Sequence, residues 1–263
     1  MNVILFPHID PVIFSIGPVS VRWYSIAYVL GIIFAHWYLH EVDKYKIFNQ
    51  KFHDSLLAWS IVGIVFGGRI GYMLIYNLSY YSNSPTEIFK IWHGGMSFHG
   101  GLIGCVIAII AVCKKHNISA LLIMDLLACA APIGLFLGRI ANFINGELFG
   151  RITDLPWGII FPGDDLARHP SQLYEAVGEG LLLFIILNLL LFFTNLRSYR
   201  GALTGIGMTF YAIIRFLIEF FREPDLQIGY LLLNLTMGQL LSISMVIIGM
   251  IIITISIKNP SNL

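Results

Sequence analysis

The chain contains few charged residues and few cysteines. Asp, Glu, Lys and Arg make up only 12% of its 263 residues, against about 25% in soluble domains. The three cysteines, Cys105, Cys113 and Cys129, lie inside apolar runs, which is typical of small buried hydrophobes and not of disulfides or metal ligands. The formal net charge of +1 provides no field that would attract nucleic acid. The first 21 residues contain no Lys or Arg, so we expect no cleavable signal peptide.

Hydrophobic residues are abundant instead. They form 57% of the sequence, and the mean hydropathy is +0.79. This composition argues against a soluble enzyme, a disordered chain or a disulfide scaffold. Seven segments approach the length of about 20 apolar residues that crosses a bilayer: 19–39, 55–77, 95–113, 120–146, 175–194, 201–221 and 235–257. We therefore predict an all-α polytopic membrane bundle of seven transmembrane helices, in a single domain over residues 1–263.

The distribution of Lys and Arg in the connections predicts the orientation of these segments. The loops after the first, third and fifth segments and the C-terminus hold eight such residues: Lys44, Lys46, Lys51, Lys114, Lys115, Arg197, Arg200 and Lys258. The opposite side holds four: Lys90, Arg151, Arg168 and Arg222. The bias predicts an N-terminus outside and a C-terminus in the cytoplasm.

Two connections are longer than simple turns. Residues 78–94 contain Pro85 and the run from Glu87 to Trp92, which favours a short interfacial helix. Residues 147–174 form an outer loop that contains three prolines. Long loops in a compact domain often carry function, so we expect this one to contribute to it.

Polar side chains gather toward the predicted outer ends of the seven segments. They are Arg22, Tyr24, Arg69, His99, Arg139, Asn142, Asn145, Glu175, Glu179, Arg215, Glu219 and Gln239. His36 and Asp125 are the exceptions, toward the inner side. Helical spacing places Arg139, Asn142 and Asn145 on one face. A second face groups Tyr211, Arg215, Glu219 and Arg222.

Glycines at intervals of four residues are predicted to let helices approach closely. They are Gly63, Gly67 and Gly71, then Gly100 and Gly104, Gly134 and Gly138, and Gly201 and Gly205. We interpret these glycines as packing positions.

Several of the polar residues also have simple structural interpretations. Arg69 is interpreted as the partner of a nearby carboxylate, and Glu219 as the partner of an arginine. Arg22 can extend to the headgroups, since it lies near a segment end, and Tyr24 can belong to an aromatic belt. Three other ionisable groups, Arg139, Arg215 and His99, lie deeper, and such groups in a membrane are functional candidates.

The side-chain chemistry of these candidates suggests a phosphate-bearing lipid. Guanidinium presents a planar set of donors that suits phosphate, and imidazole transfers protons near neutral pH. Asn142, Asn145 and Glu147 are predicted to orient these groups. No metal-binding His or Cys spacing, Walker loop or nucleophile elbow occurs in the sequence. The residues alone thus predict a lipid-phosphate site open to the outer leaflet, with a general base as an option.

Several distinctive motifs follow one another along the chain. They are Phe6-Pro7 with Asp10-Pro11-Val12-Ile13-Phe14, Gly67-Gly68-Arg69-Ile70-Gly71-Tyr72, Gly94-Gly95-Met96-Ser97-Phe98-His99-Gly100-Gly101-Leu102-Ile103-Gly104, Gly138-Arg139-Ile140-Ala141-Asn142-Phe143-Ile144-Asn145-Gly146-Glu147, Arg168-His169-Pro170-Ser171-Gln172-Leu173-Tyr174-Glu175, and Glu219-Phe220-Phe221-Arg222-Glu223-Pro224-Asp225. These motifs resemble those of the prolipoprotein diacylglyceryl transferase family. The first segment has Arg22-Trp23-Tyr24-Ser25 where relatives often have His-Trp-Tyr-Gly, and relatives can carry a longer loop between residues 161–163 and 169–172.

The resemblance implies a seven-span inner-membrane protein with its active site toward the outer leaflet. It implies transfer of the diacylglyceryl group of phosphatidylglycerol to the lipobox cysteine of a preprolipoprotein, with release of glycerol phosphate. No cofactor and no metal is implied. Carried over motif by motif, the catalytic residues are His99, Arg139 and Arg215. The substrate-binding residues are Tyr24, Arg69, Asn142, Asn145, Glu147, Gly150, Tyr211, Glu219 and Arg222.

The mechanism we expect has Arg139 and Arg215 holding the phosphate and His99 taking the proton of the substrate thiol. In a rival assignment, a phosphate oxygen accepts that proton and His99 only orients it. The main alternative function is a transporter or flippase for an anionic lipid or metabolite, although the polar groups cluster on one side. A seven-helix receptor is a third option. A retinal-binding receptor is disfavoured, because the last segment of this chain has no lysine that could form a Schiff base with retinal.

Overall fold

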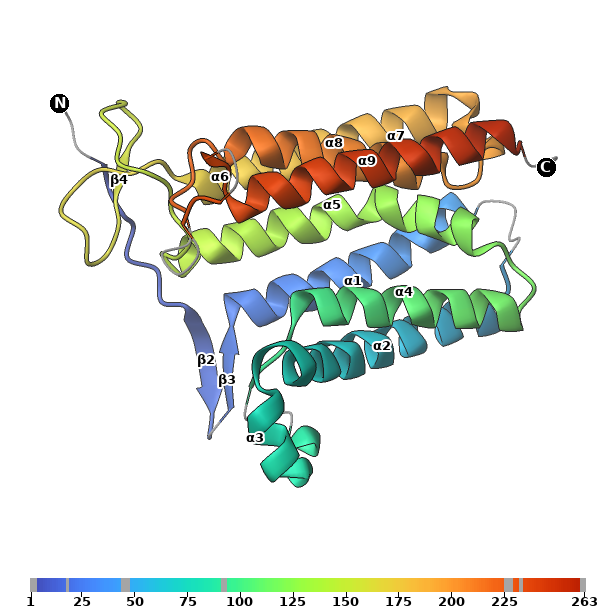
Figure 1. Cartoon of the computed structure of the whole chain (residues 1–263), viewed down its shortest axis with the longest axis horizontal. Coiled ribbons are helices and arrows are strands. Elements are labelled where there is room, and N and C mark those ends of the chain that lie inside the picture. The colour runs from blue at the N-terminus through green and yellow to red at the C-terminus, as the bar shows by residue number, and fades with distance from the viewer. Residues whose placement is uncertain are drawn as a thin grey trace. The chain divides into compact units, whose positions relative to one another are not determined.

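The computed structural model describes residues 4–17, 19–43, 48–90, 94–224, 229–231 and 234–260, and it is mostly helical (Figure 1). All seven segments that the sequence predicts to be helical form helices. They are α1 (Trp23–Val42), α2 (Gln50–Tyr76), α4 (Phe98–Lys115), α5 (Ala120–Ile144), the continuous run of α6 (Ser171–Glu175), η3 (Ala176–Leu182) and α7 (Leu183–Phe193), α8 (Ala202–Ile218) and α9 (Met237–Lys258). Shorter helices are α3 (Leu78–Asn83), η1 (Pro85–Phe89) and η4 (Asn195–Ser198).

Five of these helices are long and apolar enough to cross a membrane. They are α2, α4, α5, the run over Ser171–Phe193, and α9. Helix α8 is apolar but shorter. The polytopic membrane character predicted from composition is therefore confirmed, while the count of seven spans stays a prediction.

The all-α prediction leaves out four short strands in the described part of the chain. β2 (Val12–Ile16) pairs antiparallel with β3 (Val19–Arg22), and β1 (Ile4–Leu5) pairs parallel with β4 (Ile159–Ile160). The first helix consequently begins at Trp23, so the prediction of a helical segment from residue 19 is wrong at that end. A hydropathy count cannot separate an apolar, β-branched strand from the start of a spanning helix.

Contacts divide the chain into two compact units, Met1–Tyr38 with Asp125–Leu263, and Leu39–Met124. In the second unit, α2 packs against α4 through facing glycines. A Cβ atom added to Gly71 would lie 2.7 Å from the Cα of Gly100, and one added to Gly67 would lie 2.9 Å from the Cα of Gly104. The packing role predicted for these glycines is confirmed, because no larger side chain fits there.

The first unit contains α5, the α6–α7 run, α8 and α9. Helices α8 and α9 lie side by side (Figure 1) and meet at Gly205 and Gly249, where a Cβ on either would lie 2.8 Å from the other's carbonyl oxygen. At the N-terminus of α8, the buried carboxylate of Asp125 accepts hydrogen bonds from the backbone N–H of Gly201 (2.6 Å) and of Thr204 (2.7 Å). The carboxylate thus satisfies donors that a helix leaves unpaired and complements the helix dipole.

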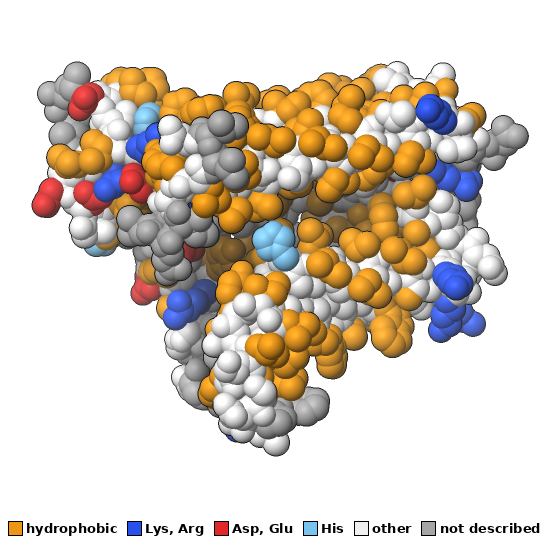
Figure 2. Space-filling model, viewed as in Figure 1, with side chains coloured by type: hydrophobic (Ala, Val, Ile, Leu, Met, Phe, Trp, Pro, Cys, Tyr) orange, Lys and Arg blue, Asp and Glu red, His pale blue; other side chains and the backbone are white. Residues whose placement is uncertain are grey.

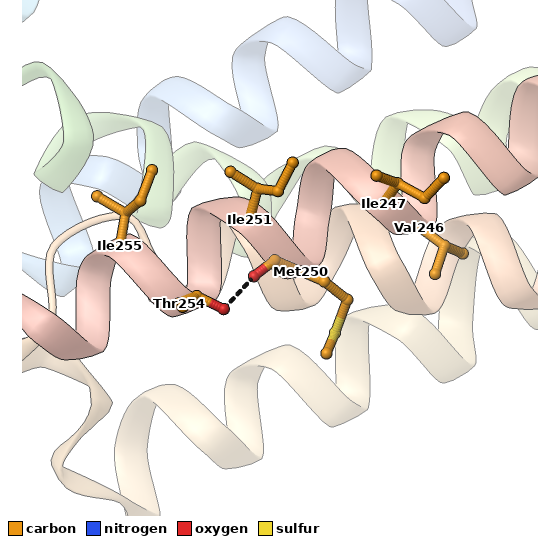
Figure 3. A pocket seen from close by; sticks show the side chains of 6 residues that line it. All are labelled: Val246, Ile247, Met250, Ile251, Thr254 and Ile255. Carbon is orange, nitrogen blue, oxygen red and sulfur yellow. Dashed lines mark hydrogen bonds between the residues drawn. The ribbon is translucent and has the colours of Figure 1, made fainter.

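The surface over the long helices is apolar. Figure 2 shows hydrophobic side chains along α9, with charged groups toward the ends of the helices. A shallow hollow on α9 is lined by six residues, drawn in Figure 3: Val246, Ile247, Met250, Ile251, Thr254 and Ile255. The one hydroxyl there, of Thr254, donates to the carbonyl oxygen of Met250 at 2.8 Å. The hydroxyl of Thr254 is therefore satisfied within the helix, as acyl chains around a membrane protein require.

The two longer connections have little regular structure. Residues 78–90 form α3 and the 3₁₀ helix η1, so part of the interfacial helix predicted over 87–92 is present, and Trp92 lies outside the described residues. The loop over 147–170 is held by isolated bridges between Gly150 and Arg222, and between Ile152 and Arg168.

Candidate functional site

Arg139, near the C-terminal end of α5, lies at the centre of a cluster of ion pairs. Its Nη1 lies 3.0 Å from Oε2 of Glu175, and its Nη2 donates to Oε2 of Glu179 at 3.1 Å. Both carboxylate side chains are fully buried, while 18% of the Arg139 side chain is exposed. Arg139 therefore has its charge balanced from the inside and keeps an accessible side.

Arg215 on α8 joins the same two carboxylates. Its Nη1 contacts Oε1 of Glu175 and lies 3.4 Å from Oε1 of Glu179. Its Nη2 lies 2.8 Å from Oε2 of Glu219, one helical turn later. The helical periodicity predicted for this face is confirmed, because Arg215 and Glu219 meet at the four-residue spacing.

Arg222, just after α8, completes the cluster. Its Nη1 donates to Oε1 of Glu175 at 2.8 Å, and its Nε lies 3.5 Å from Oε2 of Glu219. The hydroxyl of Thr236 donates to Oε1 of Glu219 at 2.9 Å, and Thr236 also caps α9 together with Gln239. The interpretation of Glu219 as the partner of an arginine is confirmed.

We call these six residues the Arg–Glu cluster: Arg139, Arg215, Arg222, Glu175, Glu179 and Glu219. Glu175 contacts all three arginines, and Glu179 contacts two of them. The formal charge of the cluster is zero when all six groups are ionised. Ionised groups at this burial are tolerated only when each is paired. Every group of the cluster has an ion-pair partner, and Oε2 of Glu175 and Oε2 of Glu219 are held by ion pairs alone, without a hydrogen bond.

The sequence prediction noted Glu175 and Glu179 but gave them no role in the site. Their spacing of four residues within an apolar run was the available signal, since two carboxylates on one helical face of a span require cationic partners. The chain around Glu179 is π-helical over Ala176–Leu182, and such turns occur frequently at functional sites.

A second polar group lies at the C-terminal end of α5 and just beyond it. Nδ2 of Asn142 donates to Oε1 of Glu147 at 2.8 Å, and Nδ2 of Asn145 donates to the same oxygen at 3.1 Å. The backbone carbonyl of Glu147 accepts from Nε2 of the buried Gln172 at 2.6 Å. The predicted grouping of Asn142, Asn145 and Glu147 is present, and Gln172 ties it to the start of α6.

Gly150 lies where two backbones nearly touch. Its N–H donates to the carbonyl of His169 at 2.8 Å, and an added Cβ would lie 2.8 Å from the Cβ of His169 and closer still to the carbonyl oxygen of Phe221. Only glycine fits this position. Gly150 thereby fixes the backbone from which Arg222 extends into the Arg–Glu cluster.

Tyr211 and Tyr24 belong to the same compact unit. Tyr211 lies on α8 one turn before Arg215. Tyr24 lies in the first turn of α1, with its ring 5.1 Å from that of Tyr28. Arg22, one residue before α1, is the last residue of β3 and is exposed.

Arg69 has a different environment from the other arginines. All its N–H groups donate to backbone carbonyl oxygens, those of Glu87 (2.6 Å), Ile88 (3.1 Å), Lys90 (3.0 Å), Gly94 and Gly95 (3.3 Å). The interpretation of Arg69 as the partner of a carboxylate is therefore wrong within the described part of the chain. Carbonyls at the end of η1 and in the loop replace it, because a 3₁₀ turn leaves its last carbonyls without donors.

His99 lies in the first turn of α4 and is exposed. Its helix is capped by Ser97, whose hydroxyl accepts from the N–H of Gly100 at 3.2 Å. His99 and Arg69 belong to the unit Leu39–Met124, whereas the Arg–Glu cluster belongs to the other unit.

The loop before α6 contains a polar chain of its own. Trp157 Nε1 donates to the hydroxyl of Tyr174 at 2.8 Å, and that hydroxyl lies 3.1 Å from Nδ1 of His169. Burial lowers the pKa of His169, which favours the neutral form of the ring. Nearby, Arg168 donates to Asp164 and lowers the pKa of that half-buried carboxyl.

Comparisons with known proteins decide the family. The family model "Prolipoprotein diacylglyceryl transferase" matches residues 11–255. The chain belongs to this family. A relative from Wolbachia pipientis wMel, named phosphatidylglycerol–prolipoprotein diacylglyceryl transferase, is 63% identical over 93% of this chain and 94% of its own. Relatives of the same name come from Ehrlichia ruminantium (strain Welgevonden), 54% identical over 95% and 97%, and Anaplasma marginale (strain Florida), 48% identical over 96% and 90%.

Membership of this transferase family gives the Arg–Glu cluster a chemical context. Three guanidinium groups and three carboxylates meet in one unit, and the arginines retain exposed fractions of 11–18%. Guanidinium suits phosphate oxygens through paired N–H donors. In the described residues no group of His, Cys, Asp and Glu has the arrangement of a metal site.

Proposed function

We propose that this protein transfers the diacylglyceryl group of phosphatidylglycerol to a cysteine thiol of a prolipoprotein, the first step of lipoprotein maturation. The observation that supports this most strongly is the cluster of Arg139, Arg215 and Arg222 in a chain of this transferase family. We further propose that the acceptor is the lipobox cysteine of the preprolipoprotein.

The site belongs to a multi-pass protein of the bacterial inner membrane. We place seven spans, the N-terminus outside, the C-terminus in the cytoplasm and the active site toward the outer leaflet. The excess of Lys and Arg in alternate connections supports this orientation. Phosphatidylglycerol then enters laterally with its headgroup at the depth of the arginines.

The arginines hold the phosphate, which becomes the leaving group. Arg139 and Arg215 are paired on their buried side with Glu175 and Glu179 and are partly exposed. Held in this way, they do not reorganise as charge develops on the departing phosphate, and preorganised donors are the main source of such electrostatic stabilisation.

His99 accepts the proton of the substrate thiol. A free thiol has a pKa near 8.5 and is weakly nucleophilic until deprotonated. The sulfur forms a bond to the glyceryl carbon next to the phosphate ester, and the bond from that carbon to the phosphate oxygen breaks. The electron pair remains on the oxygen of glycerol phosphate, and the proton passes from His99 to the phosphate or to water.

The remaining predicted residues are proposed to bind or orient the lipid. Asn142, Asn145 and Glu147 form one hydrogen-bonded group at the C-terminal end of α5. The same compact unit also contains Tyr24, Tyr211, Glu219 and Arg222. Arg69 and Gly150 contribute through the backbone, since Arg69 binds the loop before α4 and Gly150 fixes the segment before Arg222.

A reconstituted transfer assay tests this function. Purified protein is mixed with phosphatidylglycerol and a prolipoprotein, and the lipid-modified product is detected by its gel shift. Modification that requires phosphatidylglycerol and disappears when the lipobox cysteine is replaced by serine is the expected result. Movement of lipid between leaflets without thiol modification would contradict the proposal and favour a flippase.

A further inference from the structure

Two buried carboxylates of the Arg–Glu cluster, Glu175 and Glu179, pair with Arg139. Glu179 contacts fewer arginines than Glu175 does. It lies 3.1 Å from Arg139 and 3.4 Å from Arg215, whereas Glu175 contacts these two and Arg222 as well. Glu179 is fully buried, and so is Glu175. Glu175 therefore organises the three arginines, and Glu179 adds a negative charge behind two of them.

The charge balance of the cluster affects substrate and product differently. The phosphate diester of phosphatidylglycerol carries one negative charge, whereas a released phosphate monoester carries about −1.5 to −2 at pH 7. Three arginines opposed by only two carboxylates would hold the more negative product more tightly than the substrate. A site whose positive charge was not balanced by a third carboxylate would therefore release glycerol phosphate slowly.

We propose that Glu179 is a positioning residue that sets the anion affinity of Arg139 and Arg215, so that glycerol phosphate leaves after transfer. This inference rests on the proposed function, because it takes the arginines as the phosphate site. The carboxylate of Glu179 offsets part of the positive charge of these two guanidinium groups from their buried side. It weakens binding of the product more than binding of the lipid, since the product has the higher charge.

Product inhibition measures this effect. We compare wild type with Glu179→Gln, which removes the charge and nearly preserves the shape. The expected result is an inhibition constant for glycerol phosphate lower by about tenfold or more, because a unit charge within several ångströms changes binding by at least this factor at a partly buried site. The KM for phosphatidylglycerol falls less, and kcat falls with the slower release. Glycerol, which is uncharged, inhibits both proteins equally.

Two further variants separate charge from fold. Glu223→Gln removes a carboxylate that pairs with Arg168 outside the cluster and has 45% of its side chain exposed; its inhibition constant stays within about twofold of wild type, as expected for a screened surface charge. Glu179→Asp keeps the charge, and its inhibition constant also stays near wild type. Unchanged inhibition in a folded Glu179→Gln protein overturns the proposal. Tenfold tighter inhibition of Glu179→Asp by glycerol phosphate also overturns it, because that variant keeps the charge. This second test remains available if Glu179→Gln does not fold.

Direct binding keeps this inference separate from the transfer reaction. Equilibrium dialysis with radiolabelled glycerol phosphate measures affinity in detergent without turnover. A wild-type protein that fails to transfer diacylglyceryl but binds glycerol phosphate, with tighter binding in Glu179→Gln, contradicts the proposed function and supports the charge role. Absence of binding by both proteins contradicts the charge role.

Discussion

Oε1 of Glu175 accepts a hydrogen bond of 2.8 Å from Nη1 of Arg222, a residue 47 positions later in the chain. The same carboxylate pairs with Arg139 from α5 and Arg215 from α8. One fully buried side chain thus connects three segments, and the guanidinium positions depend on it. This relationship makes Glu175 the residue whose loss should affect both stability and catalysis.

Replacing Glu175 with Gln is expected to destabilise the protein and abolish transfer. Breaking a buried ion pair by removing one partner costs about 3–5 kcal/mol, because the remaining charges stay buried without compensation. Thermal unfolding in detergent measures the stability. Glu223→Gln is the matched control, with an unfolding midpoint within a few degrees of wild type. A Glu175→Gln protein that unfolds and reacts like wild type would show that the arginines do not depend on this carboxylate.

Replacing His99 with Gln tests the proton acceptor. Gln keeps hydrogen bonding but does not take a proton near neutral pH, so single-turnover transfer should slow by about 10²–10⁴-fold. Binding of phosphatidylglycerol should change little, because Arg139 and Arg215 hold the phosphate and His99 accepts only the thiol proton. Transfer at the wild-type rate would assign the proton to a phosphate oxygen and leave His99 an orienting role.

Replacing Gly150 with Ala is expected to displace Arg222. The added methyl would collide with the carbonyl of Phe221 and with His169, and overpacking of this kind typically costs about 1–3 kcal/mol. Gly163 lies in the same loop with nothing within 4 Å of an added Cβ, although its φ of +82° adds strain. We expect Gly150→Ala to lose most transfer activity and Gly163→Ala to lose stability only. Equal activities in the two variants would exclude a specific role for the close approach at Gly150.

The loop before α6 should lose stability in acid. The folded-state pKa of His169 lies below its ordinary value of about 6.5 because the ring is buried. Its contribution is therefore complete above pH 6.5 and is lost as the pH falls through that value toward the folded-state pKa. Asp164, with its pKa lowered by Arg168, acts in the same direction at lower pH, below its unfolded value of about 3.9.

Limited proteolysis of the loop at pH 7.5 and 5.5 checks this expectation. Wild type should be cut faster at the lower pH, whereas His169→Asn, which has no titrating ring, should show a smaller difference. The same pH difference in both proteins would mean that His169 does not stabilise the loop.

The sequence predicts which segments of this protein are helical better than it predicts which residues of different segments contact one another. Long apolar runs identify seven helical segments, because hydropathy and length reflect the bilayer directly. The predicted first segment began at residue 19, but Val19–Arg22 forms β3, since β-branched residues such as Val19 and Val21 suit a hairpin.

In the candidate site, too, contacts within one helix were predictable and contacts between segments were not. Spacing places Arg215 and Glu219 on one face, and they pair there. Spacing does not pair Arg139 with Glu179, which are 40 residues apart, because a helical face says nothing about the helix that packs against it. The carbonyl partners of Arg69 were unpredictable for a related reason: backbone acceptors occur at every residue and leave no signal in the sequence.

An experimental structure of the protein with phosphatidylglycerol would show directly whether the arginines hold the lipid phosphate. We expect phosphate oxygens within about 3 Å of guanidinium nitrogens of both Arg139 and Arg215, the distance of a charge-assisted hydrogen bond. A phosphate bound away from both side chains, with the Arg–Glu cluster unchanged beside it, would show that these arginines are not the phosphate site.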